Sequence, residues 1–136
     1  MIKGKQSIAF KASPYIEESA SVVGKKEGEG PLGSRFDMVG LDDMFGEDTW
    51  EKAESSMQKE ACQLALGKAH LTAGAIRYLF GGDLLRQGVA TSLGVEQLQI
   101  PMFGLYGACS TIGEALMLSA MTVQGGYSDA VLALTS

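Results

Sequence analysis

The sequence predicts an α/β domain built on a largely parallel sheet. Segments with helical periodicity alternate along the chain with short apolar runs of strand length. The last run, Asp129–Leu134, is continuously apolar, as expected for a parallel strand that is covered on both faces. Strands that alternate with helices form parallel sheets through right-handed crossovers.

Composition limits the classes of partner. The 136 residues are 46% hydrophobic and 20% charged, which is ordinary for one modest globular domain. The net charge is −5, with no basic stripe to neutralise phosphates, so we expect no nucleic-acid partner. No stretch has the length of a membrane span, and the apolar run near the N-terminus is too short for a signal peptide.

The sequence also lacks the usual cofactor motifs. It has neither the Gly-x-Gly-x-x-Gly of dinucleotide sites nor the Gly-Lys-Ser/Thr of phosphate-binding loops. Two cysteines lie 47 residues apart, at 62 and 109, and there is a single histidine, so no metal site is indicated. We therefore expect no cofactor and no metal, and free thiols.

The first part of the chain has weak periodicity. Gln6–Phe10 is a short strand candidate, and Pro14 ends or bends it. Residues 17–47 carry six glycines and show no period, which predicts a long loop. Loops of this length are often functional or mobile.

The first long helix begins at Asp48. Glu51 follows three residues later, which is the pattern of a capping box. An apolar stripe at helical spacing predicts the buried face: Trp50, Ala53, Met57, Ala61, Leu64 and Ala65. Cys62 lies beside this stripe as a packing residue. The helix ends near Gly67–His70, where a surface or capping role for the histidine is favoured over that of a catalytic base.

Two further strand–helix units follow. Ala75–Phe80 is predicted as a strand that Gly81-Gly82 ends. Asp83 then caps a helix over Leu84–Leu93, closed by Gly94. Gln97–Tyr106 leads into the next turn, with Pro101 at its entry.

The chain is organised around Met102–Glu114. Gly104 and Gly107 free the backbone to turn, Cys109 follows, and a helical pattern then runs to about Gln124. A cysteine at a strand-to-helix turn lies near free N–H groups and the positive end of the helix dipole, which suits a nucleophile. The same N–H groups could instead bind an anion. The alternative interpretation is that Cys109 is a small buried hydrophobe.

Residues 50–136 resemble the N-terminal half of the thiolase-like condensing enzymes. The similar pieces are Leu66-Gly67-Lys68-Ala69, Ile76–Gly81, Leu93-Gly94, Ala108-Cys109-Ser110 and Val131–Leu134. The resemblance implies a five-layer αβαβα fold made of two similar halves, usually as a homodimer. Residues 1–136 would form the N-terminal half-domain, and the second half would be absent from this chain.

In that family a cysteine at the Cys109 position is acylated, with histidine or asparagine partners from the second half. The segments Gly4–Phe10 and Tyr106–Thr111 are closer still to a sporulation branch of spore-forming bacteria. That branch is associated with binding dipicolinic acid or its calcium chelate. It is also associated with loading the acid into the spore, with membrane-embedded sporulation stage V A proteins. The resemblance then implies a cytoplasmic protein, or one peripheral on the spore inner membrane.

Two sets of residues are candidates for the ligand site. The first is Cys109 with the N–H groups of Ser110, Thr111 and Ile112, which open a helix and can receive one carboxylate of dipicolinate. The second is Asp83, Leu84 and Arg86, because this region reaches across the dimer in the condensing enzymes. A plain helix start capped by Asp83 is an equal alternative.

The sequence is compatible with three functions. The chain could belong to a dipicolinate-binding protein that is not an enzyme, it could be an acyltransferase with Cys109 as nucleophile, or it could be a structural half that is inert alone. The helix after Cys109 is apolar nearly all round, which is typical of a helix buried on several sides. We therefore expect this chain by itself to associate through bare apolar surface.

Overall fold

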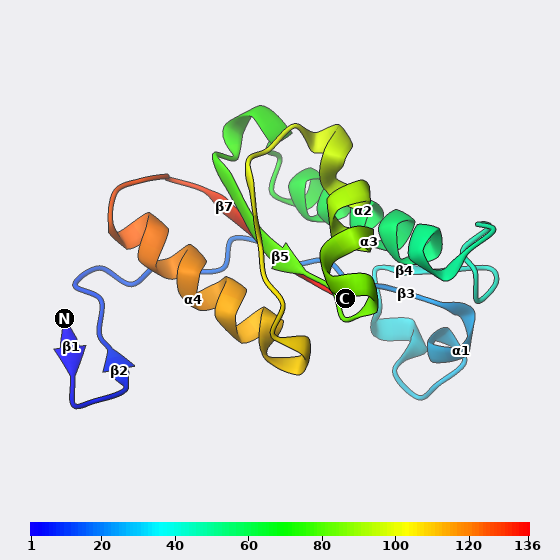
Figure 1. Cartoon of the computed structure of the whole chain (residues 1–136), viewed down its shortest axis with the longest axis horizontal. Coiled ribbons are helices and arrows are strands. Elements are labelled where there is room, and N and C mark those ends of the chain that lie inside the picture. Colours follow the sequence, from blue (N-terminus) through cyan, green and yellow to red (C-terminus); the bar gives the residue numbers. More distant parts are fainter.

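The computed structural model describes residues 1–136 and contains a three-stranded parallel sheet with helices on both faces (Figure 1). The central strand is β5 (Tyr78–Gly82), between β6 (Met102–Gly104) and β7 (Val131–Thr135). Leu79 of β5 is in register with Met102 on one side and Leu132 on the other. The α/β fold with a mostly parallel sheet is therefore confirmed.

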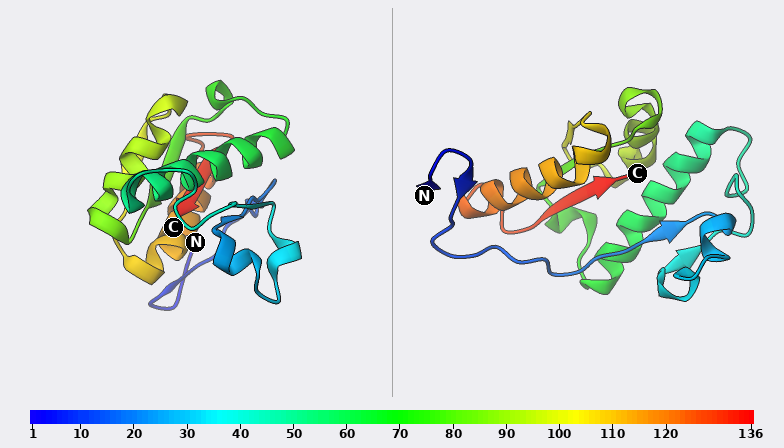
Figure 2. Two further views of the ribbon diagram at one scale, coloured as in Figure 1. Left: turned by 90° about the vertical axis from the view of Figure 1, so that its right-hand side faces the viewer. Right: turned by 90° about the horizontal axis from the view of Figure 1, so that it is seen from below.

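The helices form one layer on each face of the sheet. Helices α2 (Trp50–Lys68) and α3 (Val89–Val95) pack against each other, and α4 (Thr111–Gln124) packs on β5 and β7. Seen from below, β7 lies between α4 and α2 (Figure 2). None of the helices combines the length and the apolar character needed to cross a membrane.

The core fills the space between the sheet and α2 with α3. It is made of seven buried residues: Cys62, Leu66, Ile76, Leu79, Val95, Ile100 and Leu134. Because side chains alternate across a strand, Leu79 points to this core while Tyr78 and Phe80 point to the α4 face.

Short elements make up the remaining chain. Strands β1 (Ile2–Lys3) and β2 (Ser7–Ile8) form an antiparallel hairpin outside the main sheet, so the strand expected at Gln6–Phe10 is shorter and separate. The expected loop at 17–47 contains a parallel pair, β3 (Val22–Val23) with β4 (Met38–Val39), and a single turn, α1. Helix α1 spans Lys25–Gly28, and the 3₁₀ helices are Gly33–Arg35 (η1), Ala73–Ala75 (η2), Leu85–Gly88 (η3), Glu96–Leu98 (η4) and Ala108–Ser110 (η5).

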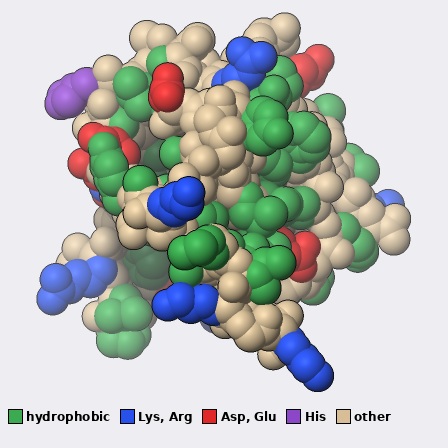
Figure 3. Space-filling model, turned by 90° about the vertical axis from the view of Figure 1, so that its left-hand side faces the viewer, with side chains coloured by type: hydrophobic (Ala, Val, Ile, Leu, Met, Phe, Trp, Pro, Cys, Tyr) green, Lys and Arg blue, Asp and Glu red, His purple; other side chains and the backbone are tan.

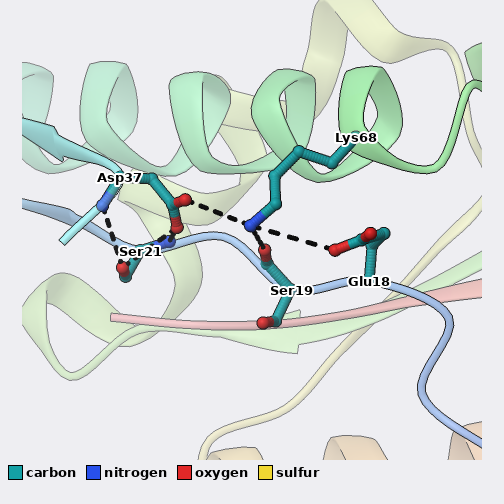
Figure 4. Close-up of polar contacts among 5 residues, drawn as sticks. All are labelled: Glu18, Ser19, Ser21, Asp37 and Lys68. Carbon is teal, nitrogen blue, oxygen red and sulfur yellow. Dashed lines mark hydrogen bonds and ion pairs between the residues drawn. The ribbon is translucent and has the colours of Figure 1, made fainter. Parts of the chain in front are cut away.

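A polar cluster fastens this N-terminal segment to the end of α2 (Figure 4). The Lys68 ammonium lies 3.1 Å from the Asp37 carboxylate and also donates to the Ser19 carbonyl at 2.5 Å. The other Asp37 oxygen accepts from the Ser21 N–H at 2.8 Å. These bonds from Lys68 and Ser21 lower the pKa of Asp37 from its usual value near 3.8.

The start of α2 differs from the expected capping box. Thr49 is the N-cap, and its hydroxyl oxygen accepts from the Lys52 N–H at 3.3 Å. Asp48 lies one residue outside and forms an ion pair with the Lys52 ammonium at 3.7 Å. Glu51 is bound instead by Arg86, at 3.0 Å, so it cannot reach back to complete the box.

The buried face of α2 is also rotated from the expected stripe. Trp50 is 61% exposed, whereas Gln58 and Cys62 are almost fully buried. The reason is tertiary: α2 must face both α3 and the sheet, and the small Ala53 and Ser55 permit the close approach of α3. Cys62 is thus a central core residue.

The two glycines expected to end β5 lie inside it. Gly81 and Gly82 pair with Leu134 and Thr135 of β7. A Cβ on Gly82 would lie 1.9 Å from the Leu105 carbonyl oxygen, so glycine permits close packing there. The helix expected at Leu84–Leu93 starts only at Val89, because Arg86, Gln87 and Gly88 all have left-handed φ angles of 57°, 57° and 90°.

The helix after Cys109 has the expected extent, and Gly125 ends it. Its expected burial on several sides is not found within this chain. Thr111, Ala115 and Ser119 face the sheet, while four large side chains are 39–49% exposed: Ile112, Leu116, Met117 and Met121. Hydrophobic side chains spread over much of the surface at the end of the molecule that carries α4 and the N-terminal hairpin (Figure 3).

Gly94, expected to close a helix, lies within α3 where it crosses α2. A Cβ there would lie 2.6 Å from the Ser55 carbonyl oxygen, which is backbone and cannot move aside easily. We expect Gly94→Ala to lower the free energy of unfolding by about 1–3 kcal/mol through overpacking. Gly67→Ala in α2, where nothing lies within 4 Å, is the control, and we expect it to stabilise the fold by up to about 1 kcal/mol. Urea denaturation of both variants measures the difference, and equal effects would contradict the close crossing.

The polar cluster around Lys68 and Asp37 leads to a second prediction. Lys68→Met should release the segment around Ser19–Asp37, seen as faster amide hydrogen exchange there, while Lys59→Met on the same helix should not. Because the folded-state pKa of Asp37 is lowered, its contribution to stability is present above pH 3.8 and is lost as pH falls through the lowered pKa. Acid should therefore open the segment in wild type. A segment that exchanges equally in both lysine variants would contradict this role.

Candidate functional site

The candidate site lies at the carboxyl edge of the sheet. Since β5, β6 and β7 are parallel, their carboxyl ends meet there, and ligands of open α/β sheets bind in the crevice outside this edge. Asp83 follows β5, the turn to Cys109 follows β6, and Ser136 follows β7. The Ser136 N–H donates to the Gly82 carbonyl at 3.3 Å and the Leu105 N–H donates to the Gly81 carbonyl at 2.8 Å, which joins the three ends.

Cys109 is exposed on η5, at the tip of the turn between β6 and α4. The structure thus excludes the interpretation that it is a buried packing residue. The preceding residue, Ala108, has a φ of 50°, a left-handed conformation that costs a non-glycine residue roughly 1 kcal/mol. Such backbone strain collects at functional sites because it aims a side chain outward.

Cys62 is the opposite kind of thiol. It is 3% exposed in the core, and burial raises its pKa to about 11. A thiol in that setting has almost no thiolate near neutral pH, so only Cys109 is placed for nucleophilic chemistry.

Two of the three N–H groups that were expected to bind a carboxylate, those of Ser110 and Thr111, are engaged at this turn. The Ser110 N–H donates to the Gly107 carbonyl at 3.0 Å, and the Thr111 N–H donates to the Ala108 carbonyl. The Thr111 side chain is buried, and its hydroxyl oxygen accepts from the Gly107 N–H at 3.2 Å. A ligand anion that uses these two N–H groups must therefore open the 3₁₀ turn.

Glu114 places a carboxylate of the protein itself in the first turn of α4. The Ser110 hydroxyl lies in hydrogen-bond contact with this carboxylate. A negative side chain is stabilised at a helix N-terminus by the dipole. Ile112, the third residue predicted to bind, is 39% exposed on the opposite side from Glu114.

Asp83 is not the N-cap of a helix starting at Leu84, which was the alternative: α3 starts at Val89 with Gly88 as its N-cap, and Asp83 holds that start from five residues earlier. It is 1% exposed, and its carboxylate accepts from the Gly88 N–H at 2.9 Å, the Thr91 N–H at 2.8 Å and the Thr91 hydroxyl at 2.6 Å. These three bonds start α3 and leave the carboxylate no free face within the chain. Leu84 is 59% exposed and Arg86 binds Glu51, so both lie on the surface.

A groove lies beside this edge, between α2, β7 and the segment that leads into β3. It encloses about 520 Å³. Ile112 closes one side, and Glu54, Gln58 and Ser136 supply most of its polar groups. The sequence does not single out Glu54 or Gln58, because neither belongs to the apolar stripe predicted for α2.

Comparison with known proteins places the chain in a family. The family model described as stage V sporulation protein AD matches residues 4–136, including the Cys109 turn. The chain belongs to the stage V sporulation protein AD family. It is 37% identical over 136 residues to Stage V sporulation protein AD of Bacillus subtilis (strain 168), a match that covers 99% of this chain. The match covers 40% of the relative, so the chain spans about two fifths of that protein's length. Membership of this family implies a role in sporulation.

The two thiols provide a test of the site geometry. Limiting iodoacetamide under native conditions should label Cys109 many times faster than Cys62, because Cys109 is exposed and the Cys62 pKa is raised to about 11. Peptide mapping by mass spectrometry measures the ratio. Both thiols should react equally in urea, which controls for intrinsic reactivity. Preferential native labelling of Cys62 would contradict the burial pattern.

Proposed function

We propose that this chain is the N-terminal part of a sporulation protein that binds dipicolinic acid and supports its uptake into the developing spore. Membership of the stage V sporulation protein AD family carries this proposal. The carboxyl edge of the sheet supports it, because an exposed thiol, the positive end of α4 and the half-exposed ring of Tyr106 lie together in this turn region.

Dipicolinate is planar, aromatic and doubly negative, so its site needs an apolar shelf and a positive field. The N-terminus of α4 supplies a partial positive charge, which the Glu114 carboxylate in the same turn partly offsets, and Ile112, the second residue of α4, supplies exposed apolar surface. Since Ser110 and Thr111 use their N–H groups within the turn, the proposal gives the field of the helix more weight than direct N–H bonds.

The proposal extends to the architecture of the full-length protein. In it, this chain forms one half of a five-layer αβαβα fold that works as a homodimer next to membrane-embedded sporulation stage V A proteins. The exposed apolar side chains of α4 support this idea, since apolar patches mark surfaces that another part covers. Leu84 and Arg86 would then reach the ligand pocket from the neighbouring subunit.

A cysteine-dependent acyltransferase is the second candidate. The exposed Cys109 on a strained turn favours it, since nucleophiles are held on such turns. In that case the thiol would attack an acyl thioester to form an acyl-cysteine and release the carrier thiol. Covalent labelling of Cys109 by an acyl-coenzyme A would distinguish this candidate from reversible binding.

The test uses calorimetric titration of the full-length protein with dipicolinate. We expect wild type and Cys109→Ser to bind with affinities within about threefold of each other, because binding needs no nucleophile. Leu84→Trp should weaken binding about tenfold if this segment lines the pocket, whereas Leu32→Trp, at a matched exposure of 57%, should not. Absence of binding by wild type, or acylation of Cys109 with turnover that serine abolishes, would overturn the proposal.

A further inference from the structure

The side chain of Glu114 reaches back over the first residue of the Cys109 turn. Its carboxylate is in hydrogen-bond contact with the Ser110 hydroxyl, one helical turn nearer the amino end of α4. A Cβ on Gly107 would lie 2.2 Å from a carboxylate oxygen of Glu114 and 2.4 Å from the Ser110 hydroxyl oxygen. Glycine at 107 therefore leaves the space in which the carboxylate and the hydroxyl meet.

The Glu114 carboxylate takes the hydroxyl that an anionic ligand would use. Ser110 is exposed, and its hydroxyl oxygen also lies 2.7 Å from the Gly107 carbonyl oxygen. A hydroxyl has one proton to donate, and a charged carboxylate is a stronger acceptor than a carbonyl. The Ser110 and Thr111 N–H groups are already bonded within the turn. Glu114 therefore holds the exposed side-chain hydroxyl of this turn.

The place that Glu114 occupies suits a carboxylate. Glu114 lies in the first turn of α4, where the positive end of the helix dipole stabilises a negative group. The contacts join only residues between 107 and 114, so this short stretch of the chain builds the arrangement locally. The Glu114 carboxylate thus stands in for a carboxylate of a bound ligand.

We propose that Glu114 is a built-in competitor for anionic ligands: its carboxylate occupies the Ser110 hydroxyl, and a ligand carboxylate reaches this hydroxyl only when Glu114 releases it. The ligand is the one in the proposed function, on which this inference rests. Two carboxylates close together repel each other, so Glu114 and a dianion such as dipicolinate do not share the turn. Ser110 is exposed, so the exchange of partners requires no change in the core. The contact is therefore autoinhibitory, and it limits binding to anions that displace Glu114.

The first test is calorimetric titration of the full-length protein with dipicolinate at low salt. Glu114→Gln keeps the shape of the side chain and removes its charge, so it should bind dipicolinate about tenfold more tightly than wild type. The gain should shrink in about 0.5 M salt, which screens the repulsion. Glu96→Gln, in η4 before β6, is the charge-matched control and should stay within about twofold of wild type. The neutral pyridine-2,6-dicarboxamide has the shape of dipicolinate without its charge and should bind wild type and Glu114→Gln equally.

The second test needs no dipicolinate and compares two alkylating reagents at Cys109. Iodoacetate is an anion and iodoacetamide is neutral, and both react with the same thiolate. The ratio of their rates therefore reports the charge around the turn, because the amount of thiolate cancels. Glu114→Gln should raise the iodoacetate-to-iodoacetamide ratio at least about threefold at low salt, whereas Glu96→Gln should leave it unchanged. Peptide mapping by mass spectrometry measures both rates.

Three results would overturn the inference. These are dipicolinate affinities that are equal in wild type and Glu114→Gln, equal effects of Glu114→Gln and Glu96→Gln, and an unchanged ratio of alkylation rates in Glu114→Gln. Absence of dipicolinate binding by every variant would overturn the proposed function, and the alkylation ratio alone then decides on the role of Glu114. Equal melting temperatures of the variants show that the effects do not come from a loss of folding.

Discussion

Hydrogen bonding of β5 to both of its neighbours is the interaction on which the rest of the structure depends. Strands β6 and β7 each pair with β5 and with no other strand. Because all three strands run in the same direction, pairing with β5 brings the Cys109 turn, Asp83 and Ser136 to the same edge of the sheet. A parallel ladder also needs both faces covered, and α2 with α3 on one side and α4 on the other provide that cover.

Close backbone approach is what makes this arrangement possible. Gly82 lets the Leu105 carbonyl approach the end of β5, and Gly94 lets α3 approach the Ser55 carbonyl of α2. Both contacts are with backbone atoms, which cannot be repacked as a side chain can. The glycines therefore bring the carboxyl edge together, whereas the left-handed residues before α3 only delay the start of that helix.

The carboxylates of Asp83 and Glu54 differ in their environments because their hydrogen-bond partners differ. Asp83 is buried but fully bonded to the start of α3, so it serves the fold. Glu54 is partly buried and lies near other negative groups, and burial is the main cause of its raised pKa. The same contrast separates the thiols, since Cys62 is held in the core and Cys109 is presented to solvent.

The sequence by itself determined the α/β class, the extent of α2 and α4, the position of Cys109 at a strand-to-helix turn and the family. These features rest on local periodicity and on short motifs, which act between residues close along the chain. Only the tertiary structure decided which face of α2 is buried, that Gly81 and Gly82 lie within β5, and that Asp83 accepts hydrogen bonds from the start of a helix six residues later. It also decided that Glu54, Gln58 and Ser136 meet, since Ser136 lies 78 residues beyond Gln58. The physical reason is that packing partners and close backbone contacts join distant segments, and no local pattern encodes which segments will meet.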